Sequence, residues 1–148
     1  MKALFRCWLL LALVLIPPAQ AEESPAVLTI AAASDLAWCM DELNAEFRRQ
    51  HPGVELKTTT GASGNFFAQI KAGAPFDVFL SADLNYPREL VKAGLAVESS
   101  LFLYATGHIA LWTTRDGVDV SAGLAALKSP AIAKVAIANP DIAPYGRA

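Results

Sequence analysis

Short apolar runs alternate with amphipathic stretches along this chain, and that alternation constrains its fold more than any other feature. Residues 27–33 (VLTIAAA) form a short, continuous apolar run, which is typical of a strand buried in a parallel sheet. Apolar residues then recur at spacings of four, three and four, which puts them on one helix face: Leu36, Met40, Leu43 and Phe47. We predict that this helix begins at Ser34 as its N-cap and ends before Pro52.

The same order of strand and helix recurs along the next part of the chain. Residues 54–58 alternate apolar and polar side chains, which indicates a strand near a sheet edge, and the turn at 61–64 (GASG) precedes a second helix. Residues 77–82 (DVFLSA) indicate another buried strand. A third helix is predicted at 87–92, with Gly94 as the C′ residue that ends it.

Three further segments continue the pattern towards residue 148. They are strands at 109–113 (IALWT) and 135–138 (VAIA), with a short helix at 121–127 between them. Alternating strands and helices predict an α/β fold with a mostly parallel sheet. In such sheets, ligands bind outside the carboxyl ends of the strands, where loops lead into helix N-termini.

The N-terminus has the pattern of an export signal. Lys2 and Arg6 precede an apolar run at 8–16, and small residues at 19–21 (AQA) form a cleavage pattern. A retained membrane anchor is the alternative, but a nine-residue run is short for a hydrocarbon core that needs about 20 residues. We therefore predict a cleavable signal peptide over residues 1–21 and a mature exported protein.

The charge and cysteine content of the mature chain argue against a nucleic-acid surface and against an internal disulfide. Two of the 12 basic residues belong to the signal, so 10 remain against 14 acidic residues, a net charge of −4. This balance argues against a general nucleic-acid surface, which needs clustered Lys and Arg. Cys39 is the only cysteine left after processing, which excludes an internal disulfide. We expect it to be packed rather than reactive.

Three predicted strand-to-helix junctions offer hydrogen-bond donors to an anion. They are Ser34–Asp35, Ser63–Gly64 and Tyr145–Gly146. The first backbone N–H groups of a helix lack intrahelical partners and favour anions. Two serine hydroxyls add neutral donors, and this combination suits an unprotonated tetrahedral oxyanion, which only accepts hydrogen bonds. Each serine alone is more often a simple N-cap.

Asp35 is the exception among these donors, because a carboxylate repels a dianion. Its side chain could point away while its backbone N–H donates to the ligand. Alternatively, it could accept a proton from hydrogen phosphate, which would change the ligand.

Three segments in order resemble the periplasmic molybdate-binding proteins of ABC importers. They are AAASDL at 31–36, GASGNFFAQIKAGAPFDVFLSAD at 61–83 and IANPDIAPYGRA at 137–148. The last is similar to the subgroup with a tyrosine in that motif. The resemblance covers residues 27–148.

The resemblance implies a two-lobed periplasmic binding protein fold of type II that closes over its ligand. Residues 22–104 would form the first α/β lobe, and residues 105–148 would begin the second. The first lobe would donate from Ser34, Ser63 and the Asp35 backbone N–H, and the second from Tyr145. The ligand would be molybdate, and tungstate too, with no bare metal ion and no cofactor. The partners would be a membrane permease and its cytoplasmic ATPase, and we expect a monomer.

The chain ends within the motif that should open a helix, whereas the family continues through the rest of the second lobe. We therefore expect this sequence to be a fragment with an incomplete second lobe.

Three other functions compete with molybdate binding. The protein could bind sulfate, phosphate or another oxyanion, which the sequence does not separate by size. It could be a secreted hydrolase with Ser34 or Ser63 as nucleophile and His108 as base, although neither serine lies in a G-x-S-x-G motif. A metal-binding protein has little support, because no His/Cys/Asp cluster has ligand spacing.

Overall fold

The computed structural model describes residues 25–148, so the predicted signal peptide at 1–21 lies outside the described residues. Within residues 25–148, no helix combines the length and apolar character needed to cross a membrane.

A three-stranded parallel sheet forms the centre of the first part of the chain. Its strands are β1 (Ala26–Ala33), β2 (Val54–Gly61) and β3 (Val78–Leu80), in the order β2-β1-β3. β1 pairs with β2 along its whole length, from Ala26 opposite Val54 to Ala33 opposite Gly61. β1 and β3 were predicted from apolar runs and β2 from alternating apolar and polar residues, and β2 lies at an edge of this sheet as predicted.

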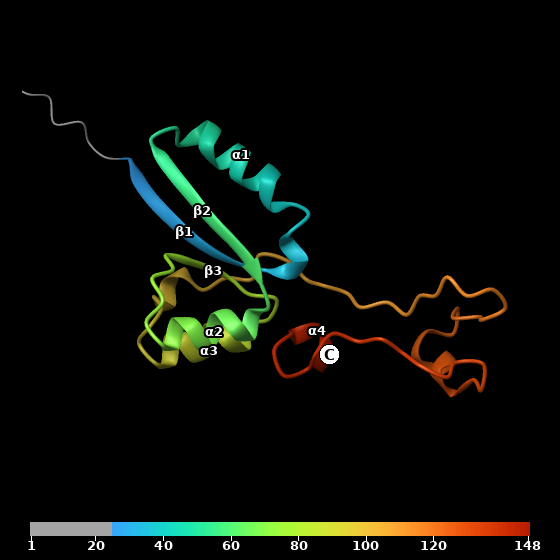
Figure 1. The fold of residues 1–148 in the computed structure, drawn as a ribbon. Helices are drawn as coiled ribbons and strands as arrows, with labels where there is room; N and C mark the ends of the chain where they lie inside the picture. The colour runs from blue at the N-terminus through green and yellow to red at the C-terminus, as the bar shows by residue number, and fades with distance from the viewer. Residues whose placement is uncertain (1–24) are drawn as a thin grey trace, which may run out of the picture.

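Helices cover both faces of the sheet (Figure 1). α1 (Met40–Gln50) lies on one side of the strands, and α2 (Ser63–Lys71) and α3 (Asn85–Lys92) lie on the other. Because the strands are pleated, alternate residues face opposite layers. Ile30, Ala32 and Leu56 pack with Met40 on the α1 side, and Phe66 of α2 packs edge-on against Phe79 on the other.

The end of α3 agrees with its predicted position, whereas the start of α1 does not. Gly94 is the predicted C′ residue: its φ is +70°, and the Leu95 N–H donates to the Leu90 carbonyl at 2.9 Å, as in a Schellman motif. The start of the first helix differs from the prediction. Ser34 begins a three-residue 3₁₀ helix, η1 (Ser34–Leu36), and its side chain caps nothing. A turn follows, so α1 begins only at Met40.

Residues 101–141 carry little regular structure, contrary to prediction. The predicted strands at 109–113 and 135–138 are irregular, and a 3₁₀ helix, η3 (Gly123–Lys128), replaces the predicted helix at 121–127. The only other elements after α3 are η2 (Glu98–Ser100) and α4 (Pro144–Arg147) within the described chain.

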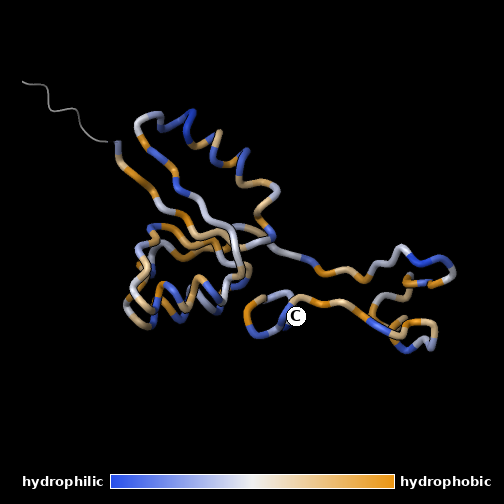
Figure 2. The backbone as a smooth tube through the Cα atoms, viewed as in Figure 1, coloured by the Kyte–Doolittle hydropathy of each residue, from blue (hydrophilic) through white to orange (hydrophobic). Residues whose placement is uncertain are grey.

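The physical reason is that a strand needs a neighbouring strand for its backbone hydrogen bonds, and none of the described residues provides one here. Figure 2 shows apolar stretches along this extended part. Trp112 is 77% exposed and Ile137 is 70% exposed, so the predicted strands keep their apolar character without a surface to pack on.

Candidate functional site

The carboxyl ends of β1 and β2 lie side by side, and both lead directly into helices. Because Ala33 pairs with Gly61, Ser34 begins η1 and Ser63 begins α2 at the same edge of the sheet. The chain passes from β1 to β2 and then crosses back to β3 on the other side of β1. Such a reversal of strand order is where ligands bind in open α/β sheets.

Asp35 and Tyr145 meet at this edge although 110 residues separate them. The Tyr145 hydroxyl of α4 donates a hydrogen bond to Asp35 Oδ2 at 2.9 Å. This hydrogen bond to a carboxylate, with partial burial, raises the pKa of Tyr145. Gly107 packs against the same tyrosine, and a Cβ at that position would overlap the Tyr145 hydroxyl and ring. The first and last of the predicted junctions are therefore in direct contact.

Ser63 is buried, with only 1% of its surface exposed. Its hydroxyl oxygen accepts a hydrogen bond from the Ala82 N–H at 3.0 Å, which ties the start of α2 to the loop after β3. In the next position, the Gly64 N–H donates to the Ile142 carbonyl at 3.0 Å. A Cβ on Gly64 would lie 2.7 Å from Tyr86 Oη and 2.9 Å from the Ile142 oxygen, so this approach requires glycine. The segment before α4 thus docks on the N-terminus of α2.

Two cavities adjoin this edge. The larger, of about 610 Å³, is lined mostly by apolar side chains of β3, α3 and residues 95–107, together with Asp35 and Tyr145. The smaller, of about 400 Å³, also contains Tyr145 and adds Arg147. Ser34, which is exposed on η1, and Ser63 line neither of them. The structure therefore brings Asp35 and Tyr145 together and leaves the two serines outside these cavities.

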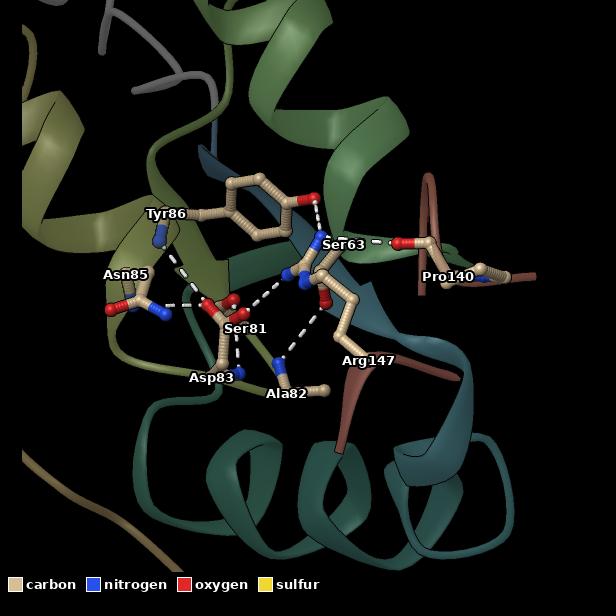
Figure 3. Close-up of polar contacts among 8 residues, drawn as sticks. All are labelled: Ser63, Ser81, Ala82, Asp83, Asn85, Tyr86, Pro140 and Arg147. Carbon is tan, nitrogen blue, oxygen red and sulfur yellow. Dashed lines mark hydrogen bonds and ion pairs between the residues drawn. The ribbon is translucent and has the colours of Figure 1, made fainter. Parts of the chain in front are cut away.

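A second polar cluster at this edge was missed by the sequence analysis (Figure 3). Arg147 of α4 pairs with Asp83 (Nη2 to Oδ2, 2.7 Å) and donates from Nη1 to Tyr86 Oη at 2.7 Å. Its guanidinium also lies 4.9 Å from the centre of the Tyr86 ring. The other Asp83 oxygen accepts from the backbone N–H groups of Asn85 and Tyr86, at 3.0 and 3.2 Å, at the start of α3. Aspartate before a helix is a readable signal. Its pairing with an arginine 64 residues away is not.

Tyr104 is a further ionisable group beside this edge. Its hydroxyl donates to the Ser81 carbonyl at 2.7 Å, and its side chain lines the larger cavity. Burial, with the nearby Asp35 charge and Tyr145, raises the pKa of Tyr104 to about 12. Tyr104 is therefore a neutral hydrogen-bond donor at physiological pH.

The geometry gives no support to hydrolytic or bare-metal chemistry in the described part of the chain. His108 is exposed and lines neither cavity, and the Ser63 oxygen accepts its hydrogen bond from the Ala82 N–H rather than from a histidine. Across residues 25–148, no group of three His, Cys, Asp or Glu residues could hold a metal ion.

Known proteins resemble this chain in both sequence and structure. It is 39% identical over 123 residues to the molybdate-binding protein ModA of Azotobacter vinelandii, an alignment that covers 83% of this chain and 48% of the relative. It is 49% identical over 88 residues to the molybdate-binding protein ModA of Rhodobacter capsulatus, covering 60% of this chain and 34% of the relative. The chain thus spans at most about half the length of these curated relatives.

The fold comparison agrees. A solved structure of an Azotobacter vinelandii periplasmic molybdate-binding protein superposes with a TM-score of 0.71 at 36% identity, over 81% of this chain and 51% of that one. This match confirms the predicted α/β periplasmic binding protein fold. Residues 28–148 also match the family model described as bacterial extracellular solute-binding protein. The chain therefore belongs to the family of bacterial extracellular solute-binding proteins.

Proposed function

We propose that this chain carries the molybdate-binding machinery of a periplasmic solute-binding protein that serves an ABC importer. The protein would reach the periplasm through a signal peptide at residues 1–21. It would capture molybdate, and tungstate as well, as a monomer. It would then deliver the ion to a membrane permease driven by a cytoplasmic ATPase. The similarity to the two molybdate-binding proteins described above supports molybdate as the ligand. Membership of the solute-binding family supports a role in transport.

One observation carries this proposal: the Tyr145 hydroxyl already donates to an anionic oxygen, Asp35 Oδ2, at the carboxyl edge of the sheet. A ligand oxygen at that position would meet the same donor. Donors from Ser34, Ser63 and the Asp35 backbone N–H would complete the first-lobe side of the site. Residues 22–104 would form that lobe, and residues 105–148 would begin the second.

The charges around the edge favour a ligand held by neutral donors. Arg147 is the cation of α4, but its ion pair with Asp83 occupies it. Tyr145 and Tyr104 are neutral phenol donors at neutral pH, and the pKa of each is raised further above its ordinary value. Hydroxyl and backbone donors suit an ion that carries no proton of its own, and molybdate at neutral pH is such an ion.

Thermal melts of the full-length protein test this function. A ligand that binds only the native state stabilises it by about 2.7 kcal/mol at a hundredfold excess over Kd. We expect molybdate and tungstate to raise the melting temperature, and sulfate or phosphate to raise it much less. Sodium chloride at equal ionic strength is the control. A shift with phosphate alone would contradict the molybdate assignment and would indicate that Asp35 accepts a proton from hydrogen phosphate.

A further inference from the structure

Two donors at the carboxyl edge of the sheet are bonded to oxygen atoms of the chain itself. The Tyr145 hydroxyl donates to Asp35 Oδ2 at 2.9 Å, and the Gly64 N–H donates to the Ile142 carbonyl at 3.0 Å. These donors come from different segments, α4 and the first turn of α2. Of the two acceptors, only Asp35 carries a charge.

The Asp35 carboxylate is not neutralised by a neighbouring cation. Among residues 25–148, none of the ion pairs within 4.0 Å includes Asp35. Arg147, two residues beyond Tyr145, pairs with Asp83 instead. No cation within ion-pair distance therefore balances the Asp35 carboxylate, which lies beside the donor that a bound oxyanion would use.

A phenol has a single proton to donate, so Tyr145 can serve only one acceptor at a time. An oxyanion that takes this hydrogen bond must displace the Asp35 oxygen from it. The displaced carboxylate stays on η1, close enough to repel a dianion. In a hydrated site, repulsion between a dianion and a single charge about 6 Å away corresponds to about a tenfold loss of affinity.

On this basis, and resting on the proposed oxyanion function, we propose that Asp35 is an affinity-setting residue whose carboxylate competes with the ligand for the Tyr145 hydroxyl. Without ligand, it holds the Tyr145 hydroxyl in its binding orientation, and it loses this hydrogen bond when the oxyanion binds. The same charge opposes ligands in proportion to their own negative charge. Asp35 thus limits how tightly a dianion can be held.

Calorimetric titration of sodium molybdate into the full-length protein tests this competition. Asp35→Asn keeps an oxygen that can accept the Tyr145 hydrogen bond but removes the charge. Asp116→Asn is the matched control, because it removes the same charge from an exposed residue that lines neither cavity. Asp35→Ser is a second neutral variant, for use if Asp35→Asn folds poorly.

We expect Asp35→Asn to bind molybdate about tenfold more tightly than the wild type, and Asp116→Asn to bind like the wild type. The gain should shrink as sodium chloride is added, because salt screens the repulsion. Unchanged or weaker binding by the neutral variants, with normal binding by the wild type, would overturn the competition alone. No binding by any of the proteins would overturn the proposed function and, with it, this inference.

Discussion

Ser63 shows how much the environment of a single residue decides its role. The sequence places it at a strand-to-helix junction, where its hydroxyl could donate to a ligand. The structure buries it and gives its oxygen a backbone partner, the Ala82 N–H. Its type and position were predictable from the sequence. Its burial depends on the loop after β3, which comes close only when the sheet forms.

Substitution of Ser63 by alanine tests this structural role. It leaves the Ala82 N–H without its partner, so we expect the free energy of unfolding to fall by about 1–2 kcal/mol. Ser129→Ala is the control: its oxygen accepts from the Ala131 N–H at 3.3 Å in an exposed setting, so the loss should be below about 0.5 kcal/mol. Denaturant unfolding measures both, and equal losses would contradict a specific role for Ser63.

The raised pKa of Tyr104 predicts that the stability of the protein depends on pH in the alkaline range. Its pKa is raised from 10.0 to about 12 in the folded protein. Between these values the unfolded chain loses the phenol proton while the folded chain keeps it, so the free energy of unfolding falls as pH rises. We expect Tyr104→Phe to make this fall less steep when denaturant midpoints are measured from pH 9 to about pH 12. An unchanged slope would show that the Tyr104 proton does not matter.

At the scale of elements, the sequence predicted the sheet and its helices because their patterns are local. Apolar runs identify β1 and β3, and helical spacing identifies α1. Boundaries were less predictable: η1 and a turn precede α1, and Leu36 of η1 packs against the core of the sheet before the helix begins. The contacts between distant elements, such as α2 with the segment before α4, leave no local pattern to read.

Gly64 tests the docking of that segment on α2. A Cβ there would come within 2.9 Å of the Ile142 oxygen, so Gly64→Ala should displace the segment and weaken molybdate binding at least about tenfold. Helix propensity alone would make the change stabilising. Gly53→Ala is the control, because nothing lies within 4 Å of a Cβ at that position. Two measurements check this docking: hydrogen exchange of the Gly64 amide in the wild type, and calorimetric titration of molybdate into the Gly64→Ala and Gly53→Ala proteins. Free exchange of the amide together with equal molybdate affinity of the two variants would contradict it.

At the scale of the molecule, the resemblance of three ordered segments predicted the family, and the fold comparison confirmed the architecture. The predicted strands at 109–113 and 135–138 failed for a physical reason. Their apolar residues lie exposed, and no described segment pairs with them. Local pattern predicts that a segment could form a strand, but only a neighbouring strand makes it one. The meeting of Asp35 and Tyr145 is likewise a property of the whole fold.

The position of the bound ion tests the central claim most directly. Crystals of the full-length protein grown with molybdate would locate molybdenum by its anomalous scattering. The account predicts one strong peak at the carboxyl edge of the sheet, within hydrogen-bond reach of the Tyr145 hydroxyl and beside the first turn of α2. A peak elsewhere on the protein, or none at this edge at saturating molybdate, would contradict it.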